Sequence, residues 1–442
     1  MKNSKLTSSI FIALILGVFV GWLFPNFANK MQPLAVIFLN MIKMIIAPLL
    51  FAVLVTGIAG HGNVKSLGRL GIKTIVYFEI VTTIALVIGL LAGHIFKPGI
   101  GFTSSISANM IDTANTMAKT NMHSSLSEML INVFPTSIVD AMATGNLLQI
   151  VVFSIFFAIS ICAIGQKAKP VLDLVSSLSD IMFKFTEFVM NFAPLGVFGA
   201  ISYTIAQNGI GIIVNYAKII FALYSALIVF VFLVLFVACK IVKISFSALV
   251  KAIREPALLA FSTATSEAAL PKAMSIMENF GIPKNIVGFV MPTGYTFNLD
   301  GSTLYLSLAV LFSTQIVGID LSIQQQLVIM LALMLTSKGI AGVPRVSLVV
   351  LAGTLASFGY PIIGVAILLG IDQILDMGRT TVNLIGNCVA TVVIARWENE
   401  FNYTKMKEFL SQNDKKKFFK HKTSSQYNSE IHIEEHSDIG NC

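Results

Sequence analysis

The segment IDQILDMGRTTVNLIGN, residues 371–387, lies between two apolar runs and carries Asp372, Asp376, Arg379, Asn383 and Asn387. Their spacing of 4, 3, 4 and 4 residues places all five within a sector of about 80° on an α-helix, at roughly 100° per residue. An ionised side chain at the centre of a membrane-spanning helix costs about 2.5–3.5 kcal/mol on insertion scales. The three charges together cost on the order of 8–10 kcal/mol, which indicates a functional face.

The composition of the whole chain indicates that this helix lies in a membrane. The 442 residues are 55% hydrophobic and 12% charged, against about 25% charged in soluble proteins, and the mean hydropathy is +0.82. A span needs roughly 20 apolar residues, and six segments meet this length: 6–25, 33–59, 72–96, 135–165, 178–206 and 212–239. We therefore predict an all-α polytopic membrane protein.

The lysines and arginines predict its orientation. They gather in the loops after the second, fourth and sixth segments and are nearly absent from the loops between, and cytoplasmic loops carry such an excess. We therefore predict an integral membrane domain over 1–400, a cytoplasmic tail over 401–442, and both termini in the cytoplasm. The net charge of +8 follows from this topology, so we expect contact with membrane lipid and no nucleic-acid partner.

Two later apolar stretches are interrupted at mid-length by small and polar residues. They are ALLAFSTATSEAALPKAMSIM (257–277) and ALMLTSKGIAGVPRVSLVVLAG (332–353). As re-entrant hairpins they leave Lys272 and Lys284 in the cytoplasm, as the positive-inside bias favours. A broken helix, GYTFNLDGSTLYLSLAVLF (294–312), follows the first, and the segment 371–387 follows the second. Paired interruptions of this kind indicate a transporter site near the bilayer midplane, because irregular backbone there must line a cavity or be buried in protein.

Two explanations remain open for Asp376 and Arg379. At positions i and i+3 of one helix, the two side chains can simply neutralise each other. Alternatively, a ligand that carries an ammonium and a carboxylate would place the ammonium on Asp376 and the carboxylate in the fork of Arg379.

A second group of residues offers hard oxygen ligands, from side chains and from carbonyls freed by the broken helix: Gly294, Thr296, Asn298, Asp300, Asn383 and Asn387. Such oxygens suit a small hard cation or a proton relay. Glu79 and Glu267 are acids at membrane depth with no adjacent base in the sequence. Because burial disfavours the charged form of a carboxyl group, both are candidate proton carriers.

Four motifs resemble those of the dicarboxylate/amino acid:cation symporters, a family that includes bacterial glutamate and aspartate transporters. They are TSEAALP (265–271), NLDGST (298–303), SKGIAGVP (337–344) and DMGRTTVNLIGN (376–387), in order within residues 1–400. The resemblance implies eight transmembrane helices plus two re-entrant helical hairpins, a homotrimer, and no cofactor besides a coupling ion. It also implies an elevator movement of transport elements 72–96 and 246–397 against scaffold spans 6–59 and 135–239.

The same resemblance implies the substrate contacts. Asp376 would bind the substrate amino group, Arg379 its side-chain carboxylate, and Thr380 and Asn383 its backbone carboxylate and amine. The hairpin tips around Ser266 and Val343 would close over the substrate from the two sides, with Ser302 nearby and Ser347 as a further contact. Members that move C4-dicarboxylates typically lack the aspartate, and neutral amino acid members lack the arginine. The resemblance therefore favours a symporter of L-glutamate and L-aspartate in the cytoplasmic (inner) membrane.

Departures from the family pattern concern the coupling ion. Asn387 stands where sodium-coupled members usually have Asp, and Glu267 stands where those members have a Ser-rich first hairpin tip. Sodium-coupled members also lack Lys338 and have Thr at the position of Ile340. These differences favour proton coupling, with a sodium-coupled acidic amino acid symporter or a C4-dicarboxylate symporter as the alternative.

Two other classes fit less well, and we do not predict an enzyme. An intramembrane aspartyl protease would also hold acids at membrane depth, but Asp300 follows Phe-Asn-Leu instead of the expected Gly-x-Gly. An ion channel would use rings of charge, whereas this chain has paired hairpins and a pair of opposite charges spaced to fit a zwitterion.

Overall fold

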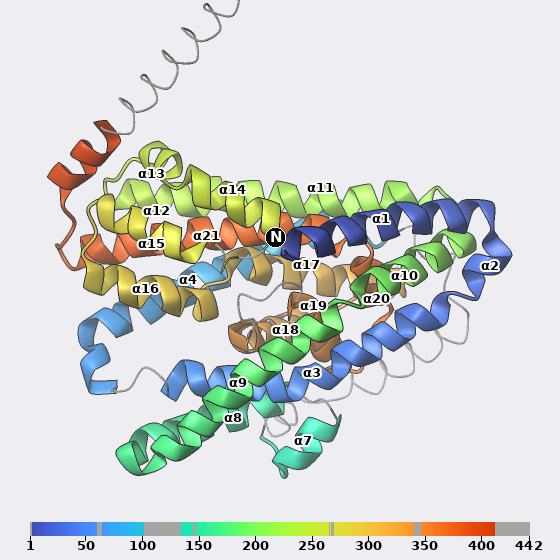
Figure 1. Ribbon diagram of the computed structural model, residues 1–442, viewed down its shortest axis with the longest axis horizontal. Helices are drawn as coiled ribbons and strands as arrows, with labels where there is room; N and C mark the ends of the chain where they lie inside the picture. Colours follow the sequence, from blue (N-terminus) through green and yellow to red (C-terminus); the bar gives the residue numbers. More distant parts are fainter. Residues whose placement is uncertain are drawn as a thin grey trace, which may run out of the picture.

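The computed structural model describes residues 2–59, 64–100, 134–144, 147–264, 266, 269–339 and 346–411. Within these residues every regular element is helical, as predicted (Figure 1). The N-terminal elements are α1 (Lys2–Leu23), α2 (Pro25–Asn29), α3 (Gln32–Ala59), α4 (Val64–Phe96), α7 (Ile138–Thr144), α8 (Leu147–Ile164), η2 (Gly165–Ala168), α9 (Lys169–Met190), α10 (Ala193–Asn208), α11 (Ile212–Phe230), η3 (Val231–Leu235) and α12 (Phe236–Ile241).

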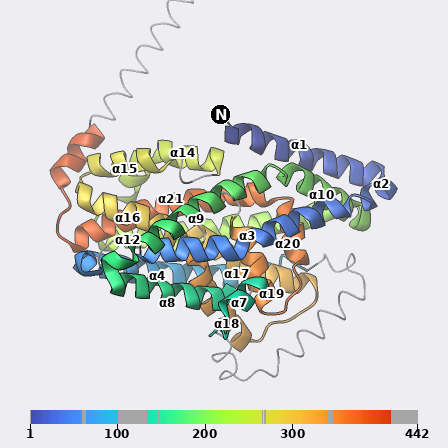
Figure 2. The same ribbon diagram turned by 60° about the horizontal axis from the view of Figure 1, so that its bottom comes forward.

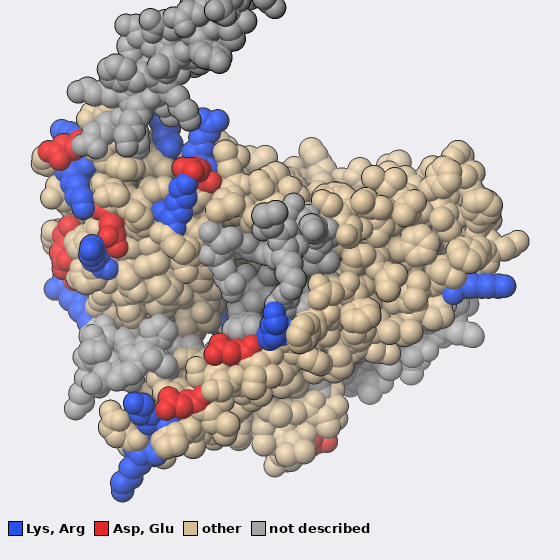
Figure 3. Space-filling view, viewed as in Figure 1, with Lys and Arg blue, Asp and Glu red and all other residues tan. Residues whose placement is uncertain are grey.

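Three helical runs in the described part of the chain are long and apolar enough to cross a membrane: Arg69–Phe96, Gln149–Thr186 and Ile213–Ile241. Ser8–Leu23 and Pro25–Phe38 meet the same criteria as a pair bent by 119°. Figure 3 shows that most charged side chains gather toward one end of the molecule, with a few along its lower edge and one at the opposite end, and that uncharged residues form much of the remaining surface. That distribution suits a body whose middle lies in lipid.

The prediction of one continuous span over 178–206 was wrong. Helix α9 begins already at Lys169 and ends at Met190, and α10 begins at Ala193. Pro194 occupies the first turn of α10, where its missing N–H and fixed φ are tolerated, although they would interrupt a continuous helix. Residues 178–206 therefore form parts of two consecutive helices.

Both predicted hairpins consist of helices too short to span a bilayer. The first comprises α13 (Phe246–Ala252), α14 (Arg254–Thr263) and α15 (Leu270–Asn279); the second comprises α18 (Ile323–Thr336), η4 (Ser337–Gly339) and α19 (Val346–Ser357). At 1.5 Å per residue, a helix of 10 residues such as α14 is about 15 Å long, half of the roughly 30 Å hydrocarbon core. These lengths fit the re-entrant interpretation.

Two broken helices separate and follow these hairpins. Helix α16 (Lys284–Phe297) ends before Asn298 and Leu299, whose φ/ψ angles are not helical, and α17 (Asp300–Ile316) begins directly after them. Helix α20 (Ile363–Leu369) is likewise separated from α21 (Asp372–Trp397) by two residues. The predicted interruption therefore lies at Asn298–Leu299, and Asp300 already belongs to the first turn of α17.

Helices α17 and α21 form the centre of the fold. Every residue of α17 except Gln315 is buried, and α21 packs against α11, α14, α16 and α17. In both ribbon views the first hairpin lies on one side of the α17–α21 pair and the second on the other (Figures 1 and 2). The polar face of α21 is therefore enclosed by protein and not exposed to lipid.

The start of the predicted tail returns to this body. The amide of Asn402 donates to the carbonyl of Gly281 at 2.8 Å, and the rings of Phe280 and Phe401 lie 6.1 Å apart. Residues 403–411 are helical, and the rest of the predicted tail lies outside the described residues.

Candidate functional site

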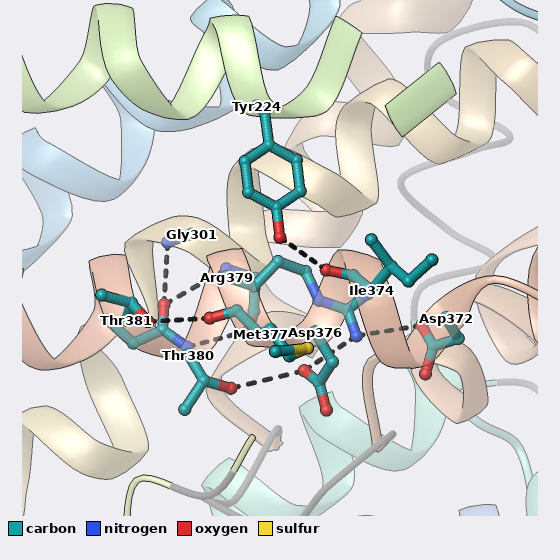
Figure 4. A network of polar contacts seen from close by, with 11 residues as sticks. Tyr224, Gly301, Asp372, Ile374, Asp376, Met377, Arg379, Thr380 and Thr381 are labelled. Atoms are coloured by element: carbon teal, nitrogen blue, oxygen red, sulfur yellow. Dashed lines mark hydrogen bonds and ion pairs between the residues drawn. The ribbon is translucent and has the colours of Figure 1, made fainter. Parts of the chain in front are cut away.

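Arg379 is the centre of a buried ionic cluster on α21. Its Nη2 lies 2.9 Å from Oδ1 of Asp372 and 2.8 Å from Oδ1 of Asp376. Its guanidinium carbon lies 4.0 Å from the ring centroid of Tyr305 on α17, within the range of a cation–π interaction. Arg379 has no exposed surface, and both carboxylates are buried (Figure 4). We call these three ionic residues, Asp372, Asp376 and Arg379, the Arg379 cluster.

The Arg379 cluster keeps polar atoms without partners. Nε and Nη1 of Arg379 and Oδ2 of Asp376 are buried and have no hydrogen-bond partner among the described residues. Leaving such a buried polar group unsatisfied costs about 1–3 kcal/mol, and more for a charged group. The Asp376–Arg379 ion pair thus exists, as the neutralisation explanation predicted, yet it leaves donors and an acceptor for a ligand.

Asn383, one turn after Arg379 on α21, binds the N-terminus of α17. Its Oδ1 accepts hydrogen bonds from the amides of Gly301 at 2.8 Å and Ser302 at 3.2 Å, and its Nδ2 donates to Oγ of Ser302 at 3.0 Å. One turn earlier on α21, Oγ1 of Thr380 donates to Oδ1 of Asp376 at 3.4 Å. Four of the predicted substrate residues on α21 therefore form two neighbouring sets of contacts: Asp376, Arg379 and Thr380 in one, and Asn383 with Ser302 in the other.

The predicted contacts from the hairpins are only partly described. Ser266 is buried before α15, and its carbonyl accepts the amides of Ala269 and Leu270. Ser347 is buried in the first turn of α19. Val343 and Glu267 lie outside the described residues, so their predicted roles stay predictions.

A second buried cluster combines a carboxylate with two carboxamides. Nδ2 of Asn298 lies 3.2 Å from Oδ2 of Asp300 and 3.1 Å from Oδ1 of Asn387. Asn298, Asp300 and Asn387, which we call the Asn298 cluster, are all buried. Oδ1 of Asn298 and Oδ1 of Asp300 have no hydrogen-bond partner in the described part of the chain. Two unpartnered hard oxygens, one of them anionic, fit a small hard cation.

Two glycines allow this cluster to form. A Cβ at Gly294 would overlap Oδ1 of Asn387, and one at Gly386 would overlap Oδ2 of Asp300. Thr296, the remaining predicted ligand, is half-buried in the last turn of α16. The close approach of α16, α17 and α21 therefore depends on the absence of a side chain at both positions.

The structure corrects the expectation that Glu79 has no adjacent base. Oε1 of Glu79 on α4 lies 3.0 Å from Nζ of Lys338 in η4. The two residues are 259 positions apart in the sequence, so spacing could not reveal the pair. Sequence reasoning also gave no site role to Asp372, although it shares the polar face of α21, and it carried no signal for Tyr305.

Paired re-entrant hairpins, two broken helices and buried ionic and oxygen-rich clusters between them define a secondary transporter of the polytopic membrane class. The chain belongs to the sodium:dicarboxylate symporter family, whose sequence profile matches residues 6–397. It is therefore a multi-pass membrane symporter and not an enzyme.

Three relatives show the range of this similarity. The chain is 46% identical over 417 residues to a proton/sodium-glutamate symport protein of Geobacillus stearothermophilus, covering 93% of this chain and 99% of the relative. It is 42% identical over 407 residues to a C4-dicarboxylate transport protein of Bacillus subtilis, covering 92% and 96%. It is 41% identical over 437 residues to a proton/glutamate-aspartate symporter of Escherichia coli, covering 94% and 99%. Overall identity therefore does not separate the two substrate classes.

Proposed function

We propose that this protein imports L-glutamate and L-aspartate by secondary active symport. The observation that carries the proposal is the buried guanidinium of Arg379, which keeps two nitrogens without a hydrogen-bond partner among the described residues. A guanidinium presents its donors as a planar fork that matches a carboxylate. Relatives named as glutamate and glutamate-aspartate symporters support this substrate class.

In this proposal the ligand replaces part of the ion pairing inside the Arg379 cluster. The ligand ammonium pairs with Asp376, whose Oδ2 has no hydrogen-bond partner among the described residues, and its side-chain carboxylate enters the fork of Arg379. Asp372 keeps its ion pair with Arg379 and holds the guanidinium in place while the ligand exchanges. Thr380 and Asn383 bind the amino acid backbone.

The remaining substrate contacts enclose the ligand from the other elements. Ser302 is already bonded to Asn383, and Ser266, Val343 and Ser347 complete the contacts from the hairpins. Movement of elements 72–96 and 246–397 against spans 6–59 and 135–239 carries the loaded site across the membrane.

We propose protons as the coupling ion, with Glu267 and Glu79 as the carriers. The sodium-coupled alternative rests on the Asn298 cluster, with Gly294, Thr296 and Asn383 as further oxygen ligands. The word sodium in the name of the relative from Geobacillus stearothermophilus supports this alternative. The C4-dicarboxylate alternative rests on the relative from Bacillus subtilis. C4-dicarboxylates, however, lack the ammonium group that Asp376 would bind.

Uptake by proteoliposomes, with a pH gradient and a sodium gradient imposed separately, tests the coupling. We expect L-glutamate uptake to follow an inward proton gradient in sodium-free buffer. Uptake that ignores the pH gradient and tracks the sodium gradient would contradict proton coupling. Competition by L-aspartate and by succinate tests the substrate, because a C4-dicarboxylate carrier would be inhibited more strongly by succinate.

We also propose a homotrimer in the cytoplasmic (inner) membrane, with both termini in the cytoplasm and no cofactor besides the coupling ion. The gathering of charge at one end of the molecule supports an oriented membrane protein (Figure 3). Native mass spectrometry of the detergent-solubilised protein would give a mass of three chains, and a monomer or dimer would contradict the assembly.

A further inference from the structure

Lys338 is a buried cation whose ammonium contacts a main-chain carbonyl at the C-terminal end of α16, next to the break between α16 and α17. It lies in η4, at the end of the first arm of the second hairpin, and is 7% exposed. Its Nζ donates to the main-chain carbonyl of Phe297 at 3.0 Å and to Oε1 of Glu79, also at 3.0 Å. A side chain of the second hairpin thus binds oxygens of both α4 and α16.

The Phe297 carbonyl lies at the C-terminal end of α16, where the local electrostatics favour a cation. Phe297 is the last residue of α16, and the chain leaves the helix at Asn298. The last carbonyls of a helix lack intrahelical partners, and this end carries the negative end of the helix dipole. In transporters, broken half-helices with such carbonyls bind Na⁺ or H⁺. Glu79 adds a carboxylate oxygen on the other side.

The ammonium of Lys338 supplies the positive charge that this place favours. At an effective dielectric constant of about 20, the ammonium of Lys338 would repel a second cation about 4 Å away by about 4 kcal/mol. This repulsion would lower the affinity for that cation roughly a thousandfold. Without Lys338, the same two oxygens would be hard ligands of the kind that sodium accepts. The Asn298 cluster begins at the next residue after Phe297, so the same charge acts on it as well.

We propose that Lys338 is a tethered cation that occupies a cation-binding position at the end of α16 and thereby determines which ion the protein uses. The ammonium takes the place of a mobile sodium ion at the Phe297 carbonyl and Glu79. This inference deepens the proposed function and rests on it, because it assigns the ion selectivity of the symporter to one side chain.

Lys73 provides a matched control elsewhere on the same helix as Glu79. Its Nζ also donates to a main-chain carbonyl at a helix end, that of Trp397 at 2.8 Å, and pairs with Oε1 of Glu398 at 2.6 Å. The side chain of Lys73 is 24% exposed, whereas that of Lys338 is 9% exposed. The two lysines share their chemistry and differ in their distance from the Asn298 cluster.

Sodium-dependent thermal stabilisation of the purified full-length protein tests the proposal without any amino acid present. Melting temperatures are measured across a sodium series at constant ionic strength, with choline as the replacement, for wild type, Lys338→Met and Lys73→Met. We expect Lys338→Met to reach half-maximal stabilisation at a sodium concentration at least tenfold lower than wild type. Lys73→Met should match wild type. Equal sodium responses of Lys338→Met and wild type would overturn the proposal.

Two further variants keep the test decisive. Lys338→Arg retains the charge and should keep the wild-type sodium response, so a gain of sodium binding in that variant would also overturn the proposal. If Lys338→Met does not fold because Glu79 is left unpaired, Glu79→Gln/Lys338→Met removes both charges. This double variant should still bind sodium more tightly than wild type, through the Phe297 carbonyl and the Asn298 cluster, and an unchanged response refutes the idea.

Uptake assays separate this inference from the proposed function. Failure of the wild-type protein to transport L-glutamate under any gradient would refute the proposed function but leave the sodium series interpretable. Conversely, glutamate uptake that stays proton-driven in a Lys338→Met protein with an unchanged sodium response would refute only the role of Lys338.

Discussion

The Arg379 cluster lies on α21 and the Asn298 cluster shares that helix only through Asn387, and the two clusters balance charge differently. The first contains two carboxylates and a guanidinium in direct contact, whereas the second contains one carboxylate and two carboxamides. Asp376 and Asn387 are separated by roughly 16 Å along α21, at 1.5 Å per residue. The first cluster is therefore matched to a ligand that carries both signs of charge, and the second to a cation.

The largest expected effect comes from breaking the charge balance of the Arg379 cluster. Arg379→Ala leaves two buried carboxylates without their cation, a loss that costs about 3–5 kcal/mol for a buried pair. We expect L-glutamate uptake in proteoliposomes to fall about 100-fold or more. Arg379→Lys keeps the charge but loses the fork, so some uptake should return. Unchanged uptake by a monodisperse Arg379→Ala protein would refute the role of Arg379.

The close packing of the Asn298 cluster can be tested with two glycines of α16. At Gly294, a Cβ would overlap Oδ1 of Asn387 and lie 3.3 Å from the ring of Phe78, whereas at Gly288 no atom lies within 4 Å. Gly294→Ala should destabilise the protein by about 1–3 kcal/mol, and Gly288→Ala should be neutral or stabilise it by about 0.5–1 kcal/mol. Thermal unfolding in detergent measures both, and equal melting temperatures would contradict the tight packing.

A carboxylate at position 387 would sharpen the difference between the clusters. Asn387→Asp places a second negative charge close to Asn298 and Asp300, and two neighbouring carboxylates stay ionised more easily with a cation between them. We expect half-maximal sodium stabilisation at a concentration about tenfold lower than in wild type, equivalent to about 1.4 kcal/mol. Asn402→Asp, at the periphery, serves as the control. A sodium response identical to the control would indicate that Asn387 does not lie in a cation site.

The smallest effect is expected at an ion pair outside both clusters. Lys272 and Glu255 link α15 to α14, with side chains that are 44% and 73% exposed. Exposed pairs contribute about 0–1 kcal/mol, so Lys272→Met should change the melting temperature little. Glutamate uptake should stay within about twofold of wild type. A large loss of uptake would show that charge at the first hairpin matters for transport and would weaken the contrast with the buried clusters.

The polar face of α21 could be predicted from sequence because helical periodicity relates residues within one element. The spacing of Asp376, Arg379 and Asn383 placed them on one face, and in the structure Arg379 pairs with Asp376 while Asn383, one turn further along, binds Ser302 of α17. Reasoning from apolar length failed for the span over 178–206, where a new helix begins at Ala193 with Pro194 in its first turn. Hydropathy measures transfer into lipid and contains no information about backbone geometry.

Contacts between distant segments were beyond the sequence. Glu79 looked isolated because no base lies near it along the chain, and the structure pairs it with Lys338. Tyr305 resembled any other aromatic residue of an apolar helix until the packing of α17 on α21 placed its ring under Arg379. Such pairs depend on how helices pack, and packing is not periodic in sequence.

The sequence by itself determined that this protein is an all-helical membrane protein with two interrupted hairpins, and that its polar residues share one face of a late helix. Apolar length, charge bias and 3.6-residue periodicity are local properties, so a single stretch of sequence is enough to identify them. Only the tertiary structure decided which distant groups meet: Tyr305 at Arg379, and Glu79 with the Phe297 carbonyl at Lys338. Burial strengthens each of these interactions, because a charge removed from water needs a partner within the protein.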